Sequence, residues 1–304
     1  MSLLVVGSIA YDTIETPVAR RENVLGGSAP FFSYAAGFFC PVQMVGVVGA
    51  DWLPEYTEMF QKQNVDTSGI EIVPDGKTFR WSGKYHDNMN DRDTVDTQLN
   101  VLGTFQPKLP EHFRRAQFVF LANCAPSTCL AALDQIYGAD LIVADTMNLW
   151  IETTRPDLDA LLKRIDGLVI NDSEAKMLTG EINTLKAARK VLTMGPRFVV
   201  VKKGEHGVVF MHKYNEYEIT VVPAYPVEDV VDPTGAGDSF AGAMMGYFVS
   251  QQGNPSAETI KNSLVYGTIV ASFGIESFSF DRFKEIDRSD IEKRREIFRE
   301  MTTF

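Results

Sequence analysis

Short apolar runs alternate with amphipathic segments along most of the chain. Leu3 to Gly7 is an apolar run that ends in glycine, and it predicts a buried strand. A helix is expected from Ser28 to Phe39 and a second strand from Val42 to Val48. Further strands, separated by helical patterns, are predicted at Phe118–Ala122, Leu141–Asp145, Leu168–Asn171, Phe198–Lys202 and Gly207–Met211. Apolar strands spaced by helices indicate an α/β fold with a doubly wound, mostly parallel sheet covered by helices.

One segment interrupts this rhythm. Thr78 to Tyr85 alternates aromatic and polar residues, which is typical of a half-exposed strand. A polar turn, His86 to Asp93, separates it from a second strand-like piece, Val95 to Val101. This hairpin is expected to form a small inserted β-sheet, a flap outside the central sheet.

Composition narrows the class of protein. The 304 residues are 45% hydrophobic and 23% charged, as in a globular protein of one large domain. The net charge of −11 argues against a nucleic-acid partner, because the phosphate backbone would be repelled. A nucleotide is compatible with this charge, since a local cradle and a metal ion outweigh the global field. The three cysteines show no CxxC spacing, and Cys124 and Cys129 are expected to be buried thiols. No apolar run reaches bilayer length and no basic leader precedes the first strand, so no membrane and a cytoplasmic location are expected.

The most informative stretch is Asp232 to Phe240, which reads DPTGAGDSF. It follows an apolar, strand-like segment, Tyr217 to Val231, and opens the predicted helix Ala236 to Ser250. Two glycines allow a tight turn and close approach of a ligand, and the first helical turn presents unpaired N–H groups to an anion. Asp238 lies in that turn, where an ionised carboxylate can act as a base. This arrangement predicts transfer of a phosphoryl group to a hydroxyl; the alternative is an ordinary glycine-rich loop with an acidic cap.

Polar side chains follow several predicted strands. They are Asp12, Asn123, Asp145 and Asn171. Ligands of open parallel sheets bind outside the carboxyl ends of the strands, so these residues are site candidates, although each is also a suitable helix cap. No P-loop motif, no GxGxxG after the first strand, and no zinc or GxSxG motif is present, which weakens the dinucleotide and hydrolase alternatives.

Two further segments carry candidate ligand chemistry. Asn171 and Glu174 are spaced i to i+3 and suit a magnesium ion held largely through water; a capping box fits the same residues equally well. Lys202 to Gly207 is a tight glycine turn between two strands, and it can line a nucleotide or be a plain hairpin.

Together these residues resemble the ribokinase-like (PfkB) carbohydrate kinases. The DPTGAGDSF stretch is similar to the family's C-terminal signature, Gly26-Gly27 to its N-terminal double glycine, and Asn171 to Glu174 to its NxxE motif. Asp12 matches the family's substrate-binding aspartate. The resemblance covers almost the whole chain. It implies one kinase domain over residues 1–304, with a lid formed by strands within about 9–25 and 70–102.

The resemblance implies the following roles. Asp238 would be the catalytic base, and the backbone N–H groups of Gly235, Ala236 and Gly237 would form the anion hole. Asn171 and Glu174 would organise Mg²⁺. Asp12, Gly26 and Gly27 would contact the acceptor, and Asn123, at a strand end, is a further substrate-binding candidate. The residues expected near ATP are Lys202, Gly204, Gly207, Thr234, Asn262, Tyr266 and Gly274. A monovalent cation near Asp232 and Thr234 and a homodimer through the lid are further expectations.

Two departures from the family pattern bear on the substrate. Pro233 replaces a threonine and keeps the loop rigid. Phe31 stands where many sugar kinases have an acceptor-binding asparagine, so it is a candidate substrate residue that favours a less polar acceptor. We therefore expect an ATP-dependent kinase acting on a primary hydroxyl of a sugar or sugar-like molecule. A nucleoside kinase, favoured by Phe31, Phe79 and Trp81, and a non-catalytic ligand sensor are the alternatives.

Overall fold

Two β-sheets organise the protein, which we describe from a computed structural model covering residues 1–213 and 219–303. The larger sheet has nine strands in the order β13-β12-β11-β10-β9-β8-β1-β4-β5. Pairing is parallel from β5 through β11, and β12 and β13 add antiparallel at one edge. The strands are Leu3–Val6 (β1), Val42–Gly49 (β4), Val65–Val73 (β5), Phe118–Leu121 (β8), Leu141–Asp145 (β9), Gly167–Asn171 (β10), Phe198–Lys202 (β11), Val208–His212 (β12) and Ile219–Val222 (β13).

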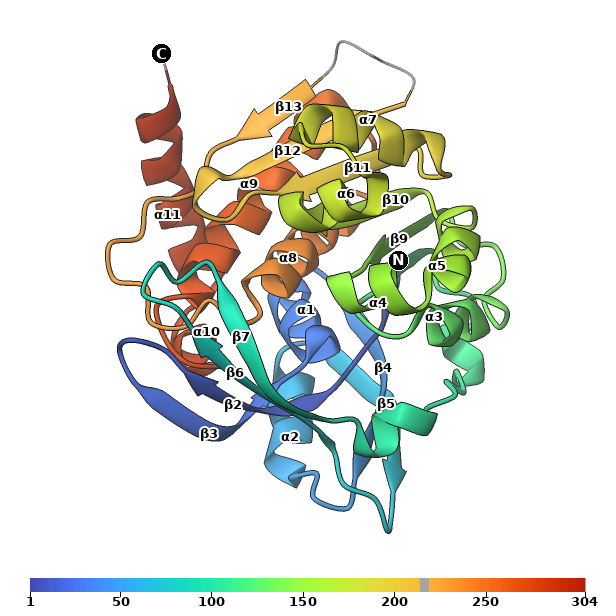
Figure 1. The fold of residues 1–304 in the computed structure, drawn as a ribbon. Helices are drawn as coiled ribbons and strands as arrows, with labels where there is room; N and C mark the ends of the chain where they lie inside the picture. The colour runs from blue at the N-terminus through green and yellow to red at the C-terminus, as the bar shows by residue number, and fades with distance from the viewer. Residues whose placement is uncertain (214–218, 304) are drawn as a thin grey trace.

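Helices cover both faces of this sheet (Figure 1). The main ones are Ser28–Gly37 (α1), Pro54–Lys62 (α2), Pro126–Leu133 (α3), Asn148–Thr153 (α4), Arg155–Leu162 (α5), Asp172–Thr179 (α6), Thr184–Thr193 (α7), Ala236–Ser250 (α8), Ala257–Gly274 (α9), Asp281–Glu285 (α10) and Arg288–Thr302 (α11). Alternate strand residues face opposite layers: Leu3 and Val5 pack with α1, α8 and α9, whereas Leu4 and Val6 pack with α3, α5 and α7. Each face therefore has its own hydrophobic core.

The second sheet forms the lid. Its four strands, in the order β3-β2-β6-β7, are Arg20–Gly26, Ala10–Glu15, Phe79–Tyr85 and Arg92–Gln98. It lies apart from the large sheet, next to α1 and α8 (Figure 1). All residues of the edge strand β7 are exposed. The expected pairing of two lids in a homodimer stays a prediction.

Several boundaries differ from the sequence-based expectation. The lid range began too early, because residues 70–73 belong to β5 of the large sheet. The second lid strand begins and ends earlier than expected, and residues 100–104 form a short 3₁₀ helix. Of the apolar segment 217–231, residues 217–218 lie outside the described residues, and only Ile219–Val222 is a strand. Strand β5 was missed because its polar and apolar residues do not form a continuous apolar run.

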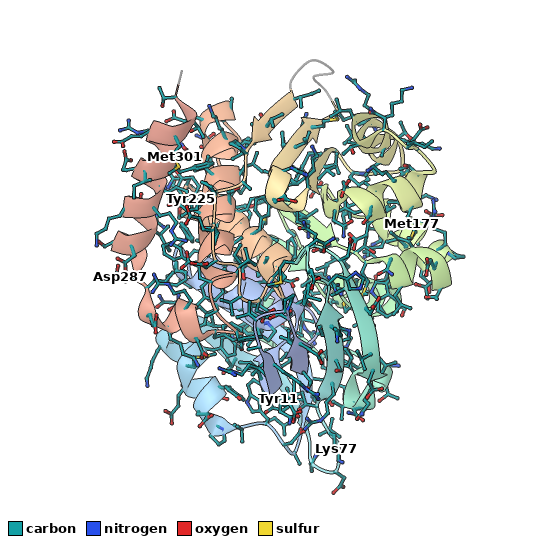
Figure 2. All side chains as sticks on the ribbon, turned by 60° about the vertical axis from the view of Figure 1, so that its left-hand side comes forward. Tyr11, Lys77, Met177, Tyr225, Asp287 and Met301 are labelled. Carbon is teal, nitrogen blue, oxygen red and sulfur yellow. The ribbon has the colours of Figure 1, made fainter. Side chains whose placement is uncertain are left out.

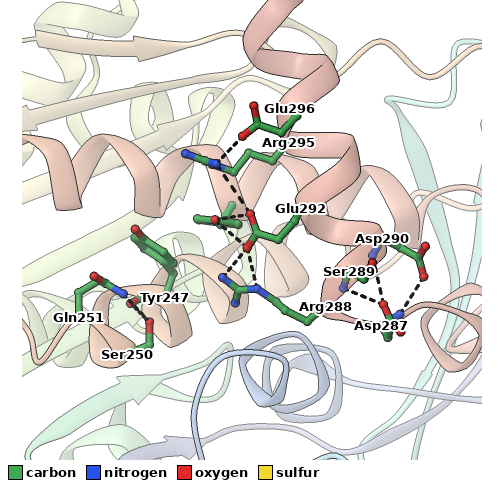
Figure 3. Close-up of polar contacts among 11 residues, drawn as sticks. Tyr247, Ser250, Gln251, Asp287, Arg288, Ser289, Asp290, Glu292, Arg295 and Glu296 are labelled. Carbon is green, nitrogen blue, oxygen red and sulfur yellow. Dashed lines mark hydrogen bonds and ion pairs between the residues drawn. The ribbon is translucent and has the colours of Figure 1, made fainter.

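The C-terminal helix α11 packs on α9 through a charged network. Tyr266 of α9 donates to both oxygens of Glu292 at 2.8 Å, and Arg288 and Arg295 pair with the same carboxylate (Figure 3). Farther along α11, the ring of Phe298 lies 6.0 Å from that of Tyr225, which comes from the segment after β13 (Figure 2). None of the helices in the described ranges is long and apolar enough to cross a bilayer.

Candidate active site

The DPTGAGDSF stretch forms a tight turn at the start of α8. Gly235 has φ of 76°, a left-handed conformation that favours glycine, and α8 begins at the next residue. The Asp232 carboxylate accepts a hydrogen bond from the Thr234 N–H at 2.9 Å, which fixes the turn. A side chain at Gly235 would lie 2.3 Å from the ring of Phe31. The backbone thus rests on an aromatic ring, with the helix N-terminus free to bind an anion.

Asp238 stands in the first turn of α8, as the sequence predicts. Burial raises its pKa to about 7; the neighbouring Asp145 acts in the same direction, while Lys202 and Arg92 oppose the shift. A carboxyl group with a pKa near neutrality is suited to accept a proton from a hydroxyl group.

Lys202 brings a positive charge to the same turn. Its Nζ lies 3.1 Å from Oδ2 of Asp145, and both side chains are largely buried. A methyl group added at Gly237 would lie 2.9 Å from this Nζ. The ammonium group therefore lies directly beside the expected anion hole.

Asp12 and the double glycine form a second cluster. A side chain at Gly26 would lie 1.9 Å from Oδ2 of Asp12, so only glycine leaves room for this carboxylate. Gly27 precedes α1 with φ of 95°. Burial, followed by the charges of Asp232 and Asp238, raises the pKa of Asp12 to about 8. The three carboxyl groups are thus close enough to interact, as a site between Asp12 and Asp238 requires.

The lid contributes two residues that sequence reasoning missed. Tyr85 is buried, and its hydroxyl accepts a hydrogen bond from Thr234 Oγ1 at 3.1 Å. Arg92 is its cross-strand partner, and the charge of Arg92 lowers the pKa of Asp12, Asp238 and Glu174. Tyr85 precedes the polar turn of the lid hairpin, and Arg92 lies near the end of that turn. A polar turn between two predicted strands was the sequence signal that could have identified them.

The tip of the same hairpin reaches the turn after β11. Nδ2 of Asn90 donates to Oε1 of Glu205 at 3.0 Å, and Gly204 approaches the side chain of Asn90. The lid therefore contacts the loop that was expected to line the nucleotide.

Asn171 and Glu174 form a capping box at the start of α6. Asn171 Oδ1 accepts from the Glu174 N–H at 2.8 Å, and Glu174 Oε2 accepts from the Asn171 N–H at 3.0 Å. Burial and then Asp145 raise the pKa of Glu174 to about 7, and a cation bound nearby would lower this pKa again. Within the described ranges no three His, Cys, Asp or Glu side chains form a metal cage. The oxygen donors fit Mg²⁺ held mainly through water and phosphate.

Asp232 has a buried oxygen that lacks a hydrogen-bond partner. Its side chain is 1% exposed, and Oδ2 makes no hydrogen bond in the described part of the chain. Burial raises its pKa to about 6, although hydrogen bonds from Thr234 and from the backbone of Ser279 oppose the shift. A buried carboxylate beside this turn fits the monovalent cation expected near Asp232 and Thr234.

Comparisons with known proteins identify the family. The model of the pfkB family of carbohydrate kinases matches residues 2–282. The chain belongs to this family. It is thus an ATP-dependent kinase, a phosphotransferase with an alcohol group as acceptor.

Two similar proteins are a cytidine kinase and a nucleoside kinase. The chain is 29% identical to a cytidine kinase of Thermococcus kodakarensis over 87% of this chain and 94% of that one. It is 24% identical to a nucleoside kinase of Methanothermobacter thermautotrophicus over 90% and 89%.

Among solved structures, the Burkholderia thailandensis nucleoside kinase in complex with inosine has a TM-score of 0.78 at 19% identity, covering 97% of each chain. An E. coli protein assigned as ribokinase II, in complex with ATP and Mg²⁺, also reaches 0.78, at 19% identity over 97% and 99%. These structures share the ribokinase-like α/β fold.

Not every predicted site residue lies open in the structure. Phe31 is 2% exposed and stacks on Phe280 with centroids 4.6 Å apart, which favours a packing role. A side chain at Gly274 would meet the ring of Phe283 at 2.8 Å, and Tyr266 is committed to Glu292. Their roles at substrate and nucleotide stay predictions.

Three other predicted residues are also placed by local contacts. Gly207 has φ of 83° and lies close to the backbone of Val222, so it shapes the β12–β13 edge. Asn123 accepts from Trp150 Nε1 at 2.8 Å, which ties the end of β8 to α4. Asn262 lies on α9 and is half-buried among its neighbours.

Proposed function

We propose that this kinase transfers the terminal phosphoryl group of ATP to the primary hydroxyl of a nucleoside. The arrangement of Asp238 beside the Gly235–Gly237 turn, with Asp12 facing the same region, carries the proposal. A base and an anion-binding helix terminus at one point are what such a transfer requires.

The lid supports a nucleoside over a free sugar. Trp81 pairs in register with Asp12, so both side chains lie on the same face of the lid. Its ring lies over Gly83, where an added side chain would be 2.1 Å away, and its Nε1 donates to Thr94 at 3.3 Å. This half-buried indole lies next to Asp12, and the guanidinium carbon of Arg92 is 5.5 Å from the ring centre, so a base that stacks here has to share the ring with Arg92 or displace it. The extended similarity to a cytidine kinase supports the same acceptor class.

Asp238 performs the proton transfer in this mechanism. Its carboxylate takes the proton of the acceptor hydroxyl as the oxygen forms a bond to the terminal phosphorus of ATP. The bond from that phosphorus to the bridging oxygen breaks, and ADP leaves with the electron pair. Backbone N–H groups of Gly235, Ala236 and Gly237 stabilise the charge on the phosphoryl oxygens.

Cations complete the electrostatics. Asn171 and Glu174 would hold Mg²⁺ through water, and the metal would neutralise phosphate charge when bound. The buried oxygen of Asp232 would bind the monovalent cation and keep the turn in place.

An acceptor panel tests the proposal. The purified protein is incubated with Mg·ATP and cytidine, uridine, adenosine, inosine, ribose, 2-deoxyribose or myo-inositol, and products are identified by mass spectrometry. We expect a nucleoside 5′-monophosphate, and no product from the matched 5′-deoxynucleoside. Phosphorylation of free sugars with no nucleoside product would overturn the nucleoside assignment and leave a sugar kinase.

A further inference from the structure

We propose that Lys202 binds the phosphoryl group during its transfer, and that Asp145 is the residue that positions Lys202 for this task. The proposal rests on the proposed kinase function of this site. The sequence predicted only that Lys202 lies near ATP and that Asp145 is a site candidate. Here each residue of this ion pair has its own role.

The large sheet brings the two residues together. Strands β9, β10 and β11 are adjacent and parallel, and they end in Asp145, Asn171 and Lys202. The side chain of Lys202 then reaches across β10 to Asp145, with Nζ and Oδ2 3.1 Å apart. The pair thus lies at the carboxyl ends of these strands, beside the α8 turn.

Asp145 is held from both sides. Oδ1 accepts the N–H of Thr146 at 2.7 Å, and Oδ2 contacts Lys202. Only 6% of the Asp145 side chain and 18% of the Lys202 side chain are exposed. A carboxylate fixed in this way holds the ammonium group in one position. Without it, the flexible lysine side chain would extend into solvent.

The position of the ammonium group points to phosphate. A methyl group at Gly237 would lie 2.9 Å from Nζ, so the charge stands against the second glycine of the anion turn. An ammonium group has three N–H donors, and Asp145 is its one carboxylate partner within 4.0 Å in the described ranges. Further donors therefore remain for the oxygens of a phosphoryl group between Lys202 and the backbone N–H groups.

A purely structural ion pair would predict different behaviour. Buried pairs are costly to form, and breaking one destabilises the fold without a specific effect on the reaction. If Lys202 contacts the moving phosphoryl group, its loss lowers turnover while leaving affinity for the product nucleotide intact, since ADP lacks that group.

The experiment compares Lys202→Met and Lys202→Gln with Lys186→Met, a control at an exposed lysine of α7. We expect kcat to fall about 10²–10³-fold in both Lys202 variants, as for loss of one preorganised donor. The Kd for ADP, measured by calorimetry, should change less than about twofold. Binding of ADP with Mg²⁺ and aluminium fluoride, a mimic of the transferring group, should weaken at least about tenfold. Lys186→Met should match the parent protein.

Asp145→Asn and the double variant Asp145→Asn/Lys202→Met test the positioning role. We expect Asp145→Asn to lower kcat, and the double variant to be no slower than Lys202→Met, because the two residues act as one unit. Independent losses that multiply would overturn the positioning role. The double variant also removes the unpaired buried carboxylate, so it keeps the test valid if Lys202→Met alone is unstable.

The outcomes separate this inference from the kinase proposal. Activity of the parent protein on any panel acceptor, with kcat and fluoride-complex affinity unchanged in the Lys202 variants, refutes the role of Lys202 alone. Absence of any nucleoside product from the parent protein refutes the proposed acceptor. In that case ADP and fluoride-complex binding still report whether Lys202 contacts a phosphoryl group.

Discussion

Thr234 of the phosphate turn donates a hydrogen bond to the hydroxyl of Tyr85 in the lid, with the two oxygens 3.1 Å apart. The donor lies one residue before the Gly235–Gly237 turn, and the acceptor lies at the end of lid strand β6. This hydrogen bond therefore connects the lid sheet to the backbone that is expected to bind phosphate.

Removing this bond should weaken coupling of lid and turn. We expect Tyr85→Phe to lower kcat/KM by about twofold to tenfold, since a neutral hydrogen bond contributes about 0.5–1.5 kcal/mol. Steady-state kinetics measure the effect, with Tyr137→Phe as control because Tyr137 is 60% exposed. Equal values for both variants would show that the bond has no part in the reaction.

Loss of the proposed base should act on turnover alone. Asp238→Asn is expected to reduce kcat by about 10²–10⁴-fold, the usual contribution of general-base assistance. Affinity for ADP, measured by calorimetry, should stay within about twofold of the parent value. Asp229→Asn, at an exposed position of the preceding loop, is the control. Full turnover in Asp238→Asn would remove this residue from the mechanism.

The rate should depend on pH through Asp238. Burial holds its pKa at about 7, and the base must be ionised, so kcat should rise with pH below about 7 and level off above it. Arg92 lowers this pKa, so Arg92→Met should move the rise to higher pH. A pH series of kcat measures both, with Arg20→Met on the opposite lid edge as control. An unmoved or downward-shifted profile in Arg92→Met contradicts this electrostatic assignment.

Asp12 should reduce stability at neutral and alkaline pH. Its pKa rises from 3.8 to about 8 on folding, so the folded state retains a proton that the unfolded chain releases between these values. Stability from this group is therefore lost as pH rises through that window. Asp12→Asn should raise Tm more at pH 8 than at pH 5, while abolishing phosphorylation. Thermal unfolding at the two pH values measures this, and an equal gain at both would show that Asp12 does not titrate as described.

Phe31 can be assigned by a substitution at its neighbour. Gly235→Ala should lower Tm for two reasons, a left-handed φ costing about 1–2 kcal/mol and a contact with the Phe31 ring. Gly138→Ala is the control, because Gly138 has φ of 71° with nothing within 4 Å of an added side chain. Phe31→Leu in the Gly235→Ala background should recover part of the difference.

The acceptor kinetics of Phe31→Leu alone decide between packing and substrate contact. We expect a lower Tm and an unchanged KM for the acceptor, because the ring is 2% exposed. A raised acceptor KM with no change in Tm would instead make Phe31 a substrate residue.

The sequence by itself determined the fold class and the chemistry of the α8 turn. Apolar strands separated by helices predicted a parallel sheet covered by helices. The helix Ala236–Ser250 has the predicted bounds, because a glycine turn marks its start and an apolar run continues from that turn. The local sequence also placed Asp238 in the first turn of α8, whereas Asp12, expected just past the first strand, lies within lid strand β2. The mixed polarity of Val65–Val73 hid β5, since pairing with β4 compensates for its weak pattern.

Only the tertiary structure decided which residues meet. Lys202 and Asp145 are 57 positions apart and become partners because two parallel strands end at the same edge. Tyr85 and Thr234 meet across 149 positions through the folding of the lid onto α8. Local patterns carry no information on such distances, because long-range contacts depend on strand order and on how two sheets pack. For the same reason, only the structure revealed that Gly235 rests on the ring of Phe31, which favours a packing role for this residue.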